Sequence, residues 1–430
     1  MAISGRFVAV VLLGLVPVLL LPGWPAILAT AAVLLALVGA DLLLAASLRQ
    51  VGTVRAEPEN VTLDNVVAAG FTLRNGGTRR LRGTFRDGWQ PSAGAQDPVQ
   101  DIDVPSGESR RFTVRLRPVR RGDLAAQHVT IRSYGPLGLA ARQRTISCPG
   151  SVRVLPPFHS RRHLPSKLRK LRELDGKAAV QIRGAGTEFD SLRDYVRGDD
   201  VRSIDWRATA RRSAVVVRTW RPERDRRVVM VLDTSRTSAA RIADETRLDT
   251  GIEAALLLAV LAERGGDRVD FVAFDRRTRA RAGSAGQGNI LGRLVQAMAP
   301  LEAELIEMDW PAVPAQVRAV SAHRSLVVLL TSLDSGAPEE GLLPTAERLA
   351  SQHVVVVAAV RDPQLGTMLH ERSDATGVFR AAAAERALLQ RAAVTAELRR
   401  CGVEVVDAEP HDLPPRLADM YIRLKTAGRL

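Results

Sequence analysis

This chain contains very little cysteine and very little lysine. Among its 430 residues there are two cysteines, Cys148 and Cys401, and they stand in no CxxC or Cys/His spacing. A disulfide framework and a structural zinc site are therefore not expected. Aromatic residues make up only 4% of the chain, so we expect cores built from leucine, valine and alanine.

Arginine supplies nearly all of the basic charge, since lysine stands only at positions 167, 170, 177 and 425, and the formal net charge is +14. Such a balance suits nucleic acid, anionic lipid or an acidic protein partner. We interpret it as a cytoplasmic face beside an anionic membrane leaflet, combined with a bias for arginine over lysine. Nucleic acid is not expected, because the basic segment Arg161–Arg172 has no interleaved aromatic residues on which bases could stack.

Long apolar runs are concentrated at the N-terminus. Phe7–Leu21 and Ala26–Leu48 are apolar apart from Asp41, and a Pro-Gly-Trp-Pro turn separates them. A membrane-spanning helix needs about 20 apolar residues. Basic residues flank the pair at Arg6 and Arg49 while the turn carries no charge, so the positive-inside rule predicts both ends in the cytoplasm. We therefore predict a multi-pass protein of the cell membrane, with a two-helix transmembrane hairpin over residues 1–48.

Two questions about this hairpin stay open in the sequence. A cleaved signal peptide is the alternative, with Arg6 as its basic start and Ala29–Ala31 as a small-residue cleavage site. Asp41 is either a functional acid inside the membrane or a residue that faces the partner helix, a neighbouring protomer or the interface.

Residues 49–158 read as a small β domain. Short alternating segments such as Arg111–Leu116 recur between turns such as Asn75–Gly77, with few helix signals. This pattern favours an antiparallel, β-sandwich-like domain. We see no cluster of histidine, cysteine or paired carboxylates there, so a spacer or interaction module is the expected role.

Residues 227–430 alternate between strand and helix patterns, which is typical of an α/β domain with a doubly wound parallel sheet. The expected strands are Val228–Leu232, Asp270–Phe274, Leu326–Leu330, Val354–Val360 and Val403–Val406, and the expected helices are Leu248–Arg264, Ile290–Leu301, Glu339–Ser351, Ala381–Arg400 and Pro415–Lys425.

Residues 159–226 connect the two domains. The Arg161–Arg172 segment has helical spacing and is expected along the membrane surface or the β domain. Phe189–Val196 is predicted as two helical turns that end at Gly198. Ser203 is predicted to cap a second short helix, and Ala214–Trp220 to form a strand.

A candidate metal site follows the first strand of the α/β domain. Asp233, Ser235 and Thr237 put one carboxylate and two hydroxyls on a tight loop, and Asp334 follows another strand. Ligands of open parallel sheets bind at the carboxyl ends of the strands, where these residues are expected to meet. Oxygen donors of this kind suit Mg²⁺.

The connector resembles a known family. Its pattern is similar to the signature of the DUF58 domain-containing proteins. The matching residues are Phe189, Leu192, Arg193, Tyr195, Gly198, Asp199, Arg202, Ile204, Asp205, Trp206, Thr209, Ala210 and Arg211. The resemblance implies a bacterial or archaeal membrane protein with a membrane hairpin, a β domain and a von Willebrand factor A-like domain. It also implies a MoxR-type AAA+ ATPase as a partner, although the role of the family is largely uncharacterised.

Within that resemblance, Asp233, Ser235, Thr237 and Asp334 match the metal-ion-dependent adhesion site of von Willebrand factor A domains. That resemblance implies a metal with an open position for a partner's carboxylate. Thr237 replaces the usual serine, Arg236 adds a positive charge, and the family's separate threonine ligand has only Thr278 and Ser284 as weak counterparts. The alternative is a loop that binds protein without metal.

The signature itself is rich in acids, including Asp199 and Asp205, but arginines nearly match them in number. Neighbouring arginines depress carboxylate pKa values, which favours a salt-bridged clasp between domains over acid–base catalysis.

We therefore expect a membrane-anchored, cytoplasm-facing interaction protein and not an enzyme. The alternatives are a metal-dependent hydrolase that uses Asp233 and Asp334, and a basic lipid-binding scaffold. A hydrolase would need a general base near the metal, and the seven histidines form no metal-binding motif.

Overall fold

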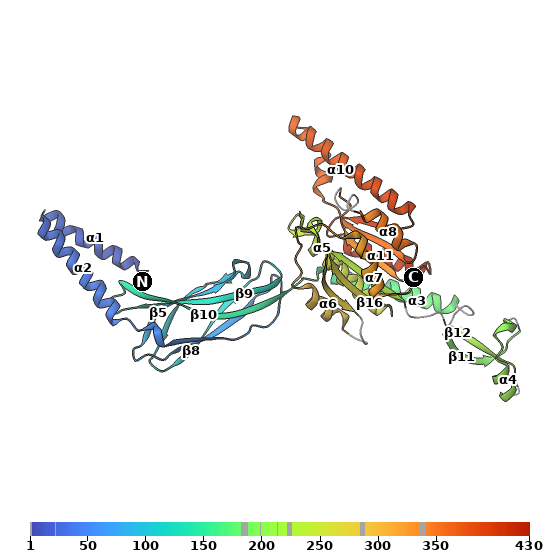
Figure 1. Cartoon of the computed structure of the whole chain (residues 1–430), viewed down its shortest axis with the longest axis horizontal. Helices are drawn as coiled ribbons and strands as arrows, with labels where there is room; N and C mark the ends of the chain where they lie inside the picture. Colours follow the sequence, from blue (N-terminus) through green and yellow to red (C-terminus); the bar gives the residue numbers. More distant parts are fainter. Residues whose placement is uncertain are drawn as a thin grey trace. The chain divides into compact units, whose positions relative to one another are not determined.

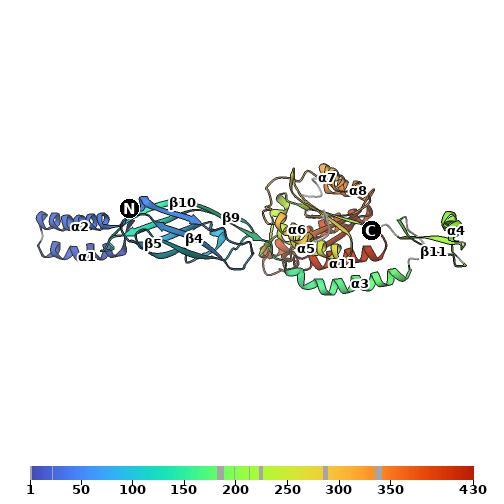
Figure 2. The same cartoon turned by 90° about the horizontal axis from the view of Figure 1, so that it is seen from below.

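The computed structural model describes residues 2–21, 23–181, 188–197, 199–212, 214–221, 226–283, 289–334 and 341–430. The chain divides into two units, Met1–Leu155 and Pro156–Leu430, which are drawn in Figures 1 and 2. Gly198 and Ser284 lie outside the described residues.

The first unit begins with a pair of apolar helices, α1 (Gly5–Leu20) and α2 (Trp24–Leu44), which lie side by side in both views. The segment Trp24–Gln50 is long and apolar enough to cross a membrane, whereas α1, at 16 residues, is shorter than that requirement. Their large apolar side chains face outward: Leu13, Leu19 and Leu35 are each at least 70% exposed. One candidate membrane helix is therefore present in the described N-terminal region.

Asp41 of α2 is fully buried and binds a turn of the β domain. Its carboxylate accepts hydrogen bonds from the backbone N–H groups of residues 137–140 at 2.7 to 3.3 Å. The turn comes close enough that a Cβ on Gly135 would lie 2.1 Å from Asp41 Oδ1. Asp41 therefore joins the end of the apolar helix to the β domain, a partner that was not among those expected from the sequence.

The start of α1 is bound to the same turn. Strand β1 (Ala2–Ile3) pairs with the beginning of β10 (Ala140–Leu155). Ser4 then donates its hydroxyl to the carbonyl of Gly138 at 2.6 Å. Both ends of the helical hairpin are consequently fixed to one short piece of β structure.

The rest of the first unit is a pair of β-sheets that share one core. One sheet has the order β1-β10-β9-β5-β7, with β3 beside β10, and the other has the order β2-β4-β8-β6. The core between them contains Phe71 and Leu116 from the second sheet, and Phe85 and Ile131 from the first. The remaining strands are β2 (Val51–Arg55), β3 (Val61–Thr62), β4 (Val67–Asn75), β5 (Leu81–Trp89), β6 (Ala95–Gln96), β7 (Val99–Val104), β8 (Ser109–Leu116) and β9 (Gly122–Tyr134).

An ion pair is buried inside this β structure. Arg55 and Asp87 form two hydrogen bonds of 2.6 and 3.0 Å, and their side chains are 2% and 0% exposed. Burial of Arg55 disfavours its charge, but the hydrogen bond and the charge of Asp87 outweigh this and raise its pKa. Trp89 donates to the same carboxylate at 2.8 Å. All of these groups are thus satisfied, which a buried charge requires.

The second unit is built on a sheet with the order β17-β16-β13-β18-β19-β20. The strands are parallel except for β17, which runs antiparallel to β16. They are β13 (Arg227–Asp233), β16 (Arg268–Phe274), β17 (Thr278–Gly283), β18 (Leu326–Thr331), β19 (Val354–Val360) and β20 (Glu404–Ala408).

Helices cover both faces of this sheet. Met230 and Leu232 of β13 pack in a core with α5 (Arg247–Arg264) and α11 (Leu413–Thr426). Val229 and Val231 point to the opposite core, with α7 (Val313–Val320) and α8 (Leu343–Ala350). Successive residues of a strand face opposite sides, so a strand buried on both faces reads as an unbroken apolar run. The other helices are α6 (Ile290–Met298), α9 (Gln364–Met368) and α10 (Ala375–Arg400).

The basic segment before the connector packs on this second unit. Helix α3 (Leu164–Gln181) places Leu171, which is 2% exposed, in the core beneath α5 and α11, with Leu164 and Leu168 against it. Lys167 binds Asp419 of α11 at 2.6 Å. The expectation that Arg161–Arg172 lies on the membrane or the β domain is therefore wrong, because its leucines complete the α/β core.

The connector differs from its predicted helices. Residues Glu188–Asp194 form strand β11, which pairs with β12 (Val216–Arg221), so the predicted helix over Phe189–Val196 is wrong. The pairing shifts by a residue between Phe189 and Ser191, and such a bulge replaces the two-residue period of a strand with a helix-like spacing.

The second predicted helix also starts later than expected. Ser203 lies in a 3₁₀ turn, and α4 spans Trp206–Arg212. Asp205 precedes α4, and its carboxylate accepts from the N–H groups of Arg207 and Ala208 at 3.0 Å. Asp205 is therefore the capping residue, since an aspartate at this place binds N–H groups that a helix leaves free.

Replacing Asp41 should weaken the first unit strongly. Asp41→Ala leaves buried N–H groups of residues 137–140 without an acceptor, and each such group costs about 1–3 kcal/mol. We expect a clear fall in the thermal midpoint of the full chain in neutral detergent. Asp101→Ala, at an exposed position of β7, is the control. Equal midpoints for the two variants would show that Asp41 does not stabilise the turn.

Candidate functional site

The candidate site lies where parallel strands of the second unit end. β13 ends at Asp233, β18 at Thr331, and β16 at Phe274, which Asp275 follows. β13 pairs in parallel with both β16 and β18, so these ends share one edge of the sheet. The edge gathers polar side chains above strands that are otherwise apolar.

Hydroxyl and amide groups surround the Asp233 carboxylate. It accepts from the N–H of Ser235 at 2.8 Å, from the hydroxyl of Thr237 at 3.0 Å and from the hydroxyl of Thr331 at 2.6 Å. The Ser235 and Thr237 hydroxyls are 3.2 Å apart. Asp233 is 1% exposed, and burial raises its pKa although these hydrogen bonds oppose the shift.

The oxygen donors of the Asp233 loop are of the kind that a hard divalent cation binds. Within the described residues, no arginine or lysine forms an ion pair with Asp233, so its buried charge lacks a cationic partner. Carboxylate and hydroxyl oxygens are donors that Mg²⁺ accepts. In the described part of the chain, no group of three or more His, Cys, Asp or Glu residues is placed to hold a metal, so hydroxyls would have to contribute. The structure thus brings Asp233, Ser235 and Thr237 together.

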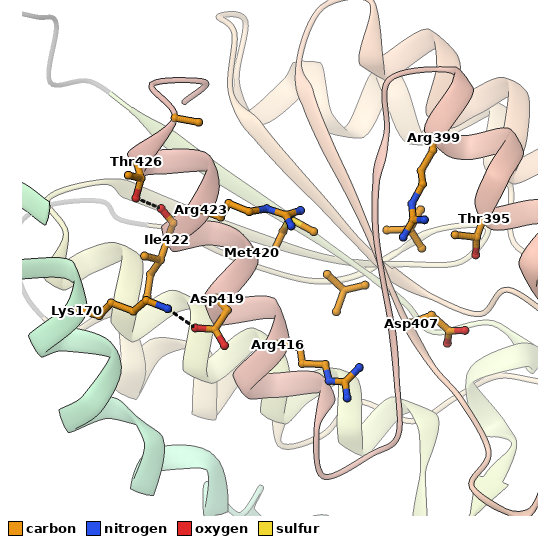
Figure 3. A pocket seen from close by; sticks show the side chains of 13 residues that line it. Lys170, Thr395, Arg399, Asp407, Arg416, Asp419, Met420, Ile422, Arg423 and Thr426 are labelled. Carbon is orange, nitrogen blue, oxygen red and sulfur yellow. Dashed lines mark hydrogen bonds and ion pairs between the residues drawn. The ribbon is translucent and has the colours of Figure 1, made fainter. Parts of the chain in front are cut away.

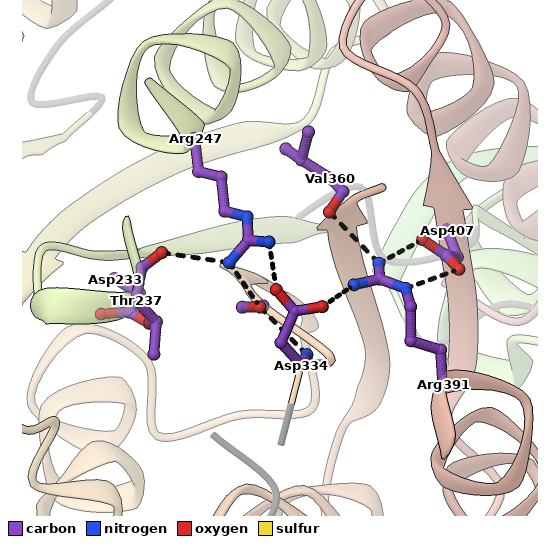
Figure 4. A network of polar contacts seen from close by, with 8 residues as sticks. Asp233, Thr237, Arg247, Asp334, Val360, Arg391 and Asp407 are labelled. Carbon is purple, nitrogen blue, oxygen red and sulfur yellow. Dashed lines mark hydrogen bonds and ion pairs between the residues drawn. The ribbon is translucent and has the colours of Figure 1, made fainter. Parts of the chain in front are cut away.

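Asp334 belongs to a different arrangement, shown in Figure 4. One of its carboxylate oxygens binds Arg247 and the other binds Arg391. Arg391 also binds Asp407 at 2.6 Å and the carbonyl of Val360 at 3.2 Å. Acidic side chains and arginines therefore alternate in one network of ion pairs.

Arg247 connects this network of ion pairs to the Asp233 loop. Its guanidinium donates to the carbonyl of Thr237 at 3.3 Å and to the hydroxyl of Ser332 at 3.1 Å. The positive charge beside Asp334 is thus supplied by guanidinium groups, and no contact joins Asp334 to Asp233 among the described residues. The role of Asp334 as a metal ligand stays a prediction, while Thr331 supplies a hydroxyl directly at Asp233.

Several residues at this edge were not identified from the sequence. Thr331 and Asp275 each stand at the end of a predicted strand, and that position is the signal that could have found them. Asp275 is buried and accepts from Thr234 at 2.9 Å and from Arg279 at 2.5 Å. Burial opposes its charge, but Arg279 and backbone N–H groups outweigh this and lower its pKa. Arg247 and Arg391 sit in helices, where no sequence signal marks them.

The connector signature forms a compact network of its own. Asp199 binds Arg193 through two hydrogen bonds of 2.6 and 2.8 Å, and this contact lowers the pKa of Asp199. Asp205 binds Arg218 at 2.8 Å, and its pKa is lowered first by the N–H of Ala208 and then by Arg218. Tyr195 donates its N–H to Val215 at 2.8 Å.

Other members of the signature face solvent. Trp206 is 69% exposed, and Arg202 and Arg211 are exposed as well. In residues 188–221, as far as they are described, the hydrogen bonds and ion pairs stay within the connector. The predicted role as a clasp between the domains stays a prediction.

Removing Arg391 should destabilise the second unit. Arg391→Met leaves Asp407 without its buried partner, and breaking such a pair costs about 3–5 kcal/mol. Arg380→Met on the same helix is the control, because Arg380 is exposed and its ion pair with Glu371 is worth at most about 1 kcal/mol. Urea unfolding followed by circular dichroism measures both changes, and equal midpoints would contradict the importance of Arg391.

The comparisons with known proteins give one matching family and a few uncharacterized relatives. Residues 191–371 match the family described as "Protein of unknown function DUF58". Uncharacterized proteins of Mycobacterium tuberculosis and Mycobacterium bovis are each 28% identical to this chain over 199 residues. The match covers 44% of this chain, which spans 60% of the length of these curated relatives.

Solved structures show only weak likeness. An ASH / PapD-like domain of a human protein has a TM-score of 0.18 and 10% identity, with 24% of this chain and 84% of that chain covered. A beta-glucosidase from Listeria innocua has a TM-score of 0.16 and 10% identity, with 25% and 17% covered. The match over residues 191–371 contains most of the connector signature, and it confirms that this part of the chain resembles the DUF58 family.

Proposed function

We propose that this chain is a membrane-anchored, cytoplasm-facing interaction protein. Its α/β domain would be von Willebrand factor A-like and would bind a protein partner at the Asp233 edge. A MoxR-type AAA+ ATPase is the proposed partner, in line with what the family resemblance implies. The observation that carries the proposal is the buried Asp233 carboxylate, which is surrounded by hydroxyls and has no cationic partner among the described residues.

The hairpin geometry supports a two-pass anchor. Asp41, at the end of α2, and Ser4, before α1, both bind the turn that contains Gly138. If α2 crosses a membrane, the start of α1 must therefore lie on the same side as the end of α2. The apolar residues that face outward from both helices suit contact with lipid.

The Asp233 edge supports a binding role that depends on Mg²⁺. Asp233, Ser235 and Thr237 would hold the ion, with Thr331 as a further hydroxyl donor. A metal here would supply the missing positive charge and an open position for an acidic group of the partner. A von Willebrand factor A-like arrangement also suits the parallel order of β16, β13 and β18 around this loop.

The contacts of Asp334 favour binding over catalysis. A metal hydrolase that uses both acids would need Asp334 as a ligand or a base. Both of its oxygens already meet guanidinium groups, those of Arg247 and Arg391. Each oxygen is thus already occupied by a guanidinium group, which leaves neither of them free for a metal ion or for an attacking water.

Magnesium and partner binding can be tested on the full chain in neutral detergent. Mg²⁺ at a hundred times its dissociation constant should raise the free energy of unfolding by about 2.7 kcal/mol. Asp233→Asn keeps the size of the side chain but removes its charge, and it should abolish this gain. Asp244→Asn, at an exposed loop position, is the control and should retain the gain.

The same variants test the partner. A purified MoxR-type AAA+ ATPase should bind the wild-type chain and Asp244→Asn with equal affinity, and lose about tenfold or more with Asp233→Asn or with EDTA. Binding that survives both treatments would rule out the Asp233 edge as the contact. Binding that survives EDTA alone would leave a metal-free contact and reject the magnesium site.

A further inference from the structure

A cavity of about 840 Å³ lies beside the last strand of the second unit (Figure 3). Residues of β20 form one wall, and α10, α11 and α3 contribute the others. Val405 and Val406 of β20, together with Ile422 and Met420 of α11, supply apolar surface. The cavity has the size of a typical ligand site.

The strand that borders this cavity is an edge strand. Within the described residues, β20 pairs with β19 on one side and with no strand on the other. The N–H of Arg361 donates to the carbonyl of Ala408 at 2.8 Å, which directs Ala408 toward β19. Because alternate residues of a parallel strand bond to opposite sides, the backbone groups of Val405 and Asp407 point toward the open edge.

In the described part of the chain, no strand pairs with β20 on the side to which these backbone groups point. Both residues line the cavity. A row of free donors and acceptors along an edge is a template for another strand.

The rim of the cavity is positively charged. Lys170, Arg399, Arg416 and Arg423 line it and are exposed, whereas Asp407 and Asp419 are its acids. Asp407 is paired with Arg391, and Asp419 with Lys167 and Lys170. Arg416 and Arg423 form exposed ion pairs with Asp412 and Glu404, and exposed pairs of this kind contribute little free energy. Cations outnumber acids among these residues, so a second copy of the same edge would bring like charges together. An acidic partner therefore fits this surface better than the chain itself.

We propose that an extended acidic peptide of a partner protein adds to β20 as a further strand, with alternate side chains in the cavity and acidic groups near Arg399, Arg416 and Arg423. Backbone hydrogen bonds to Val405 and Asp407 provide the affinity that does not depend on sequence. The cationic rim favours peptides that carry negative charge. None of the residues that line this cavity belongs to the Asp233 loop, so the two proposals rest on different binding residues.

Fluorescence anisotropy with the full chain in neutral detergent tests the charge requirement. The probe is a short labelled peptide of alternating valine and glutamate, and its counterpart carries lysine in place of glutamate. The acidic probe should bind and the basic one should not. Arg399→Glu should weaken the acidic probe about tenfold, while Arg400→Glu, a change of equal charge on the neighbouring exposed residue, stays within about twofold.

Two methylated probes test the strand pairing. One carries N-methyl groups on its valines and the other on its glutamates, so that each blocks the backbone donors of one edge. Strand addition predicts that one of them loses about tenfold in affinity while the other binds nearly as well as the parent.

The contrary results are equally clear. Equal effects of the two methylated probes, equal effects of Arg399→Glu and Arg400→Glu, or no binding of the acidic probe would each overturn the proposal. Asp233→Asn should leave probe affinity unchanged, so a failure here is distinguishable from a failure of the Asp233 edge.

Discussion

The carboxylate of Asp41 is the interaction on which the arrangement of the first unit depends. A lone acid at the end of an apolar helix would be costly to bury, but here consecutive backbone N–H groups share its charge. Arg142 adds a hydrogen bond of 2.8 Å to the carbonyl of Leu42, one of those that the helix end leaves free. Backbone groups on both sides of the junction between the apolar helix and the β-sheet are therefore paired by these side chains.

The second unit uses the same principle of satisfied charge, but with arginine in place of backbone. Arg247, Asp334, Arg391 and Asp407 form an alternating series in which each group has an opposite charge beside it. Lysine would serve poorly here, since a planar guanidinium can bind two carboxylates at once. The strong preference of this chain for arginine thus has a structural use in its interior and not only on its surface. Asp233 is the contrasting case at the same edge, because hydroxyls and not cations surround it.

Much of the α/β unit could be predicted because buried parallel strands are continuous apolar runs. The strand Val354–Val360 was predicted with the bounds that it has, and α5 begins one residue earlier than predicted. The connector was harder, since a bulge in β11 produces apolar spacings that resemble a helix. The loop at Asp233 could be found because its ligand-like residues are adjacent in sequence. The partners of Asp334 could not, since they lie 87 and 57 residues away and no local pattern links them.

The long strand β10 has a consequence for spacing. It starts at Ala140, beside the N–H groups that bind Asp41, and ends at Leu155, the last residue of the first unit. At about 3.3 Å per residue, its 16 residues extend about 50 Å. The length of this one strand therefore sets the distance between the apolar hairpin and the point where the chain leaves the first unit. An insertion in a surface loop would leave that reach unchanged, whereas a change in the length of β10 would alter it directly.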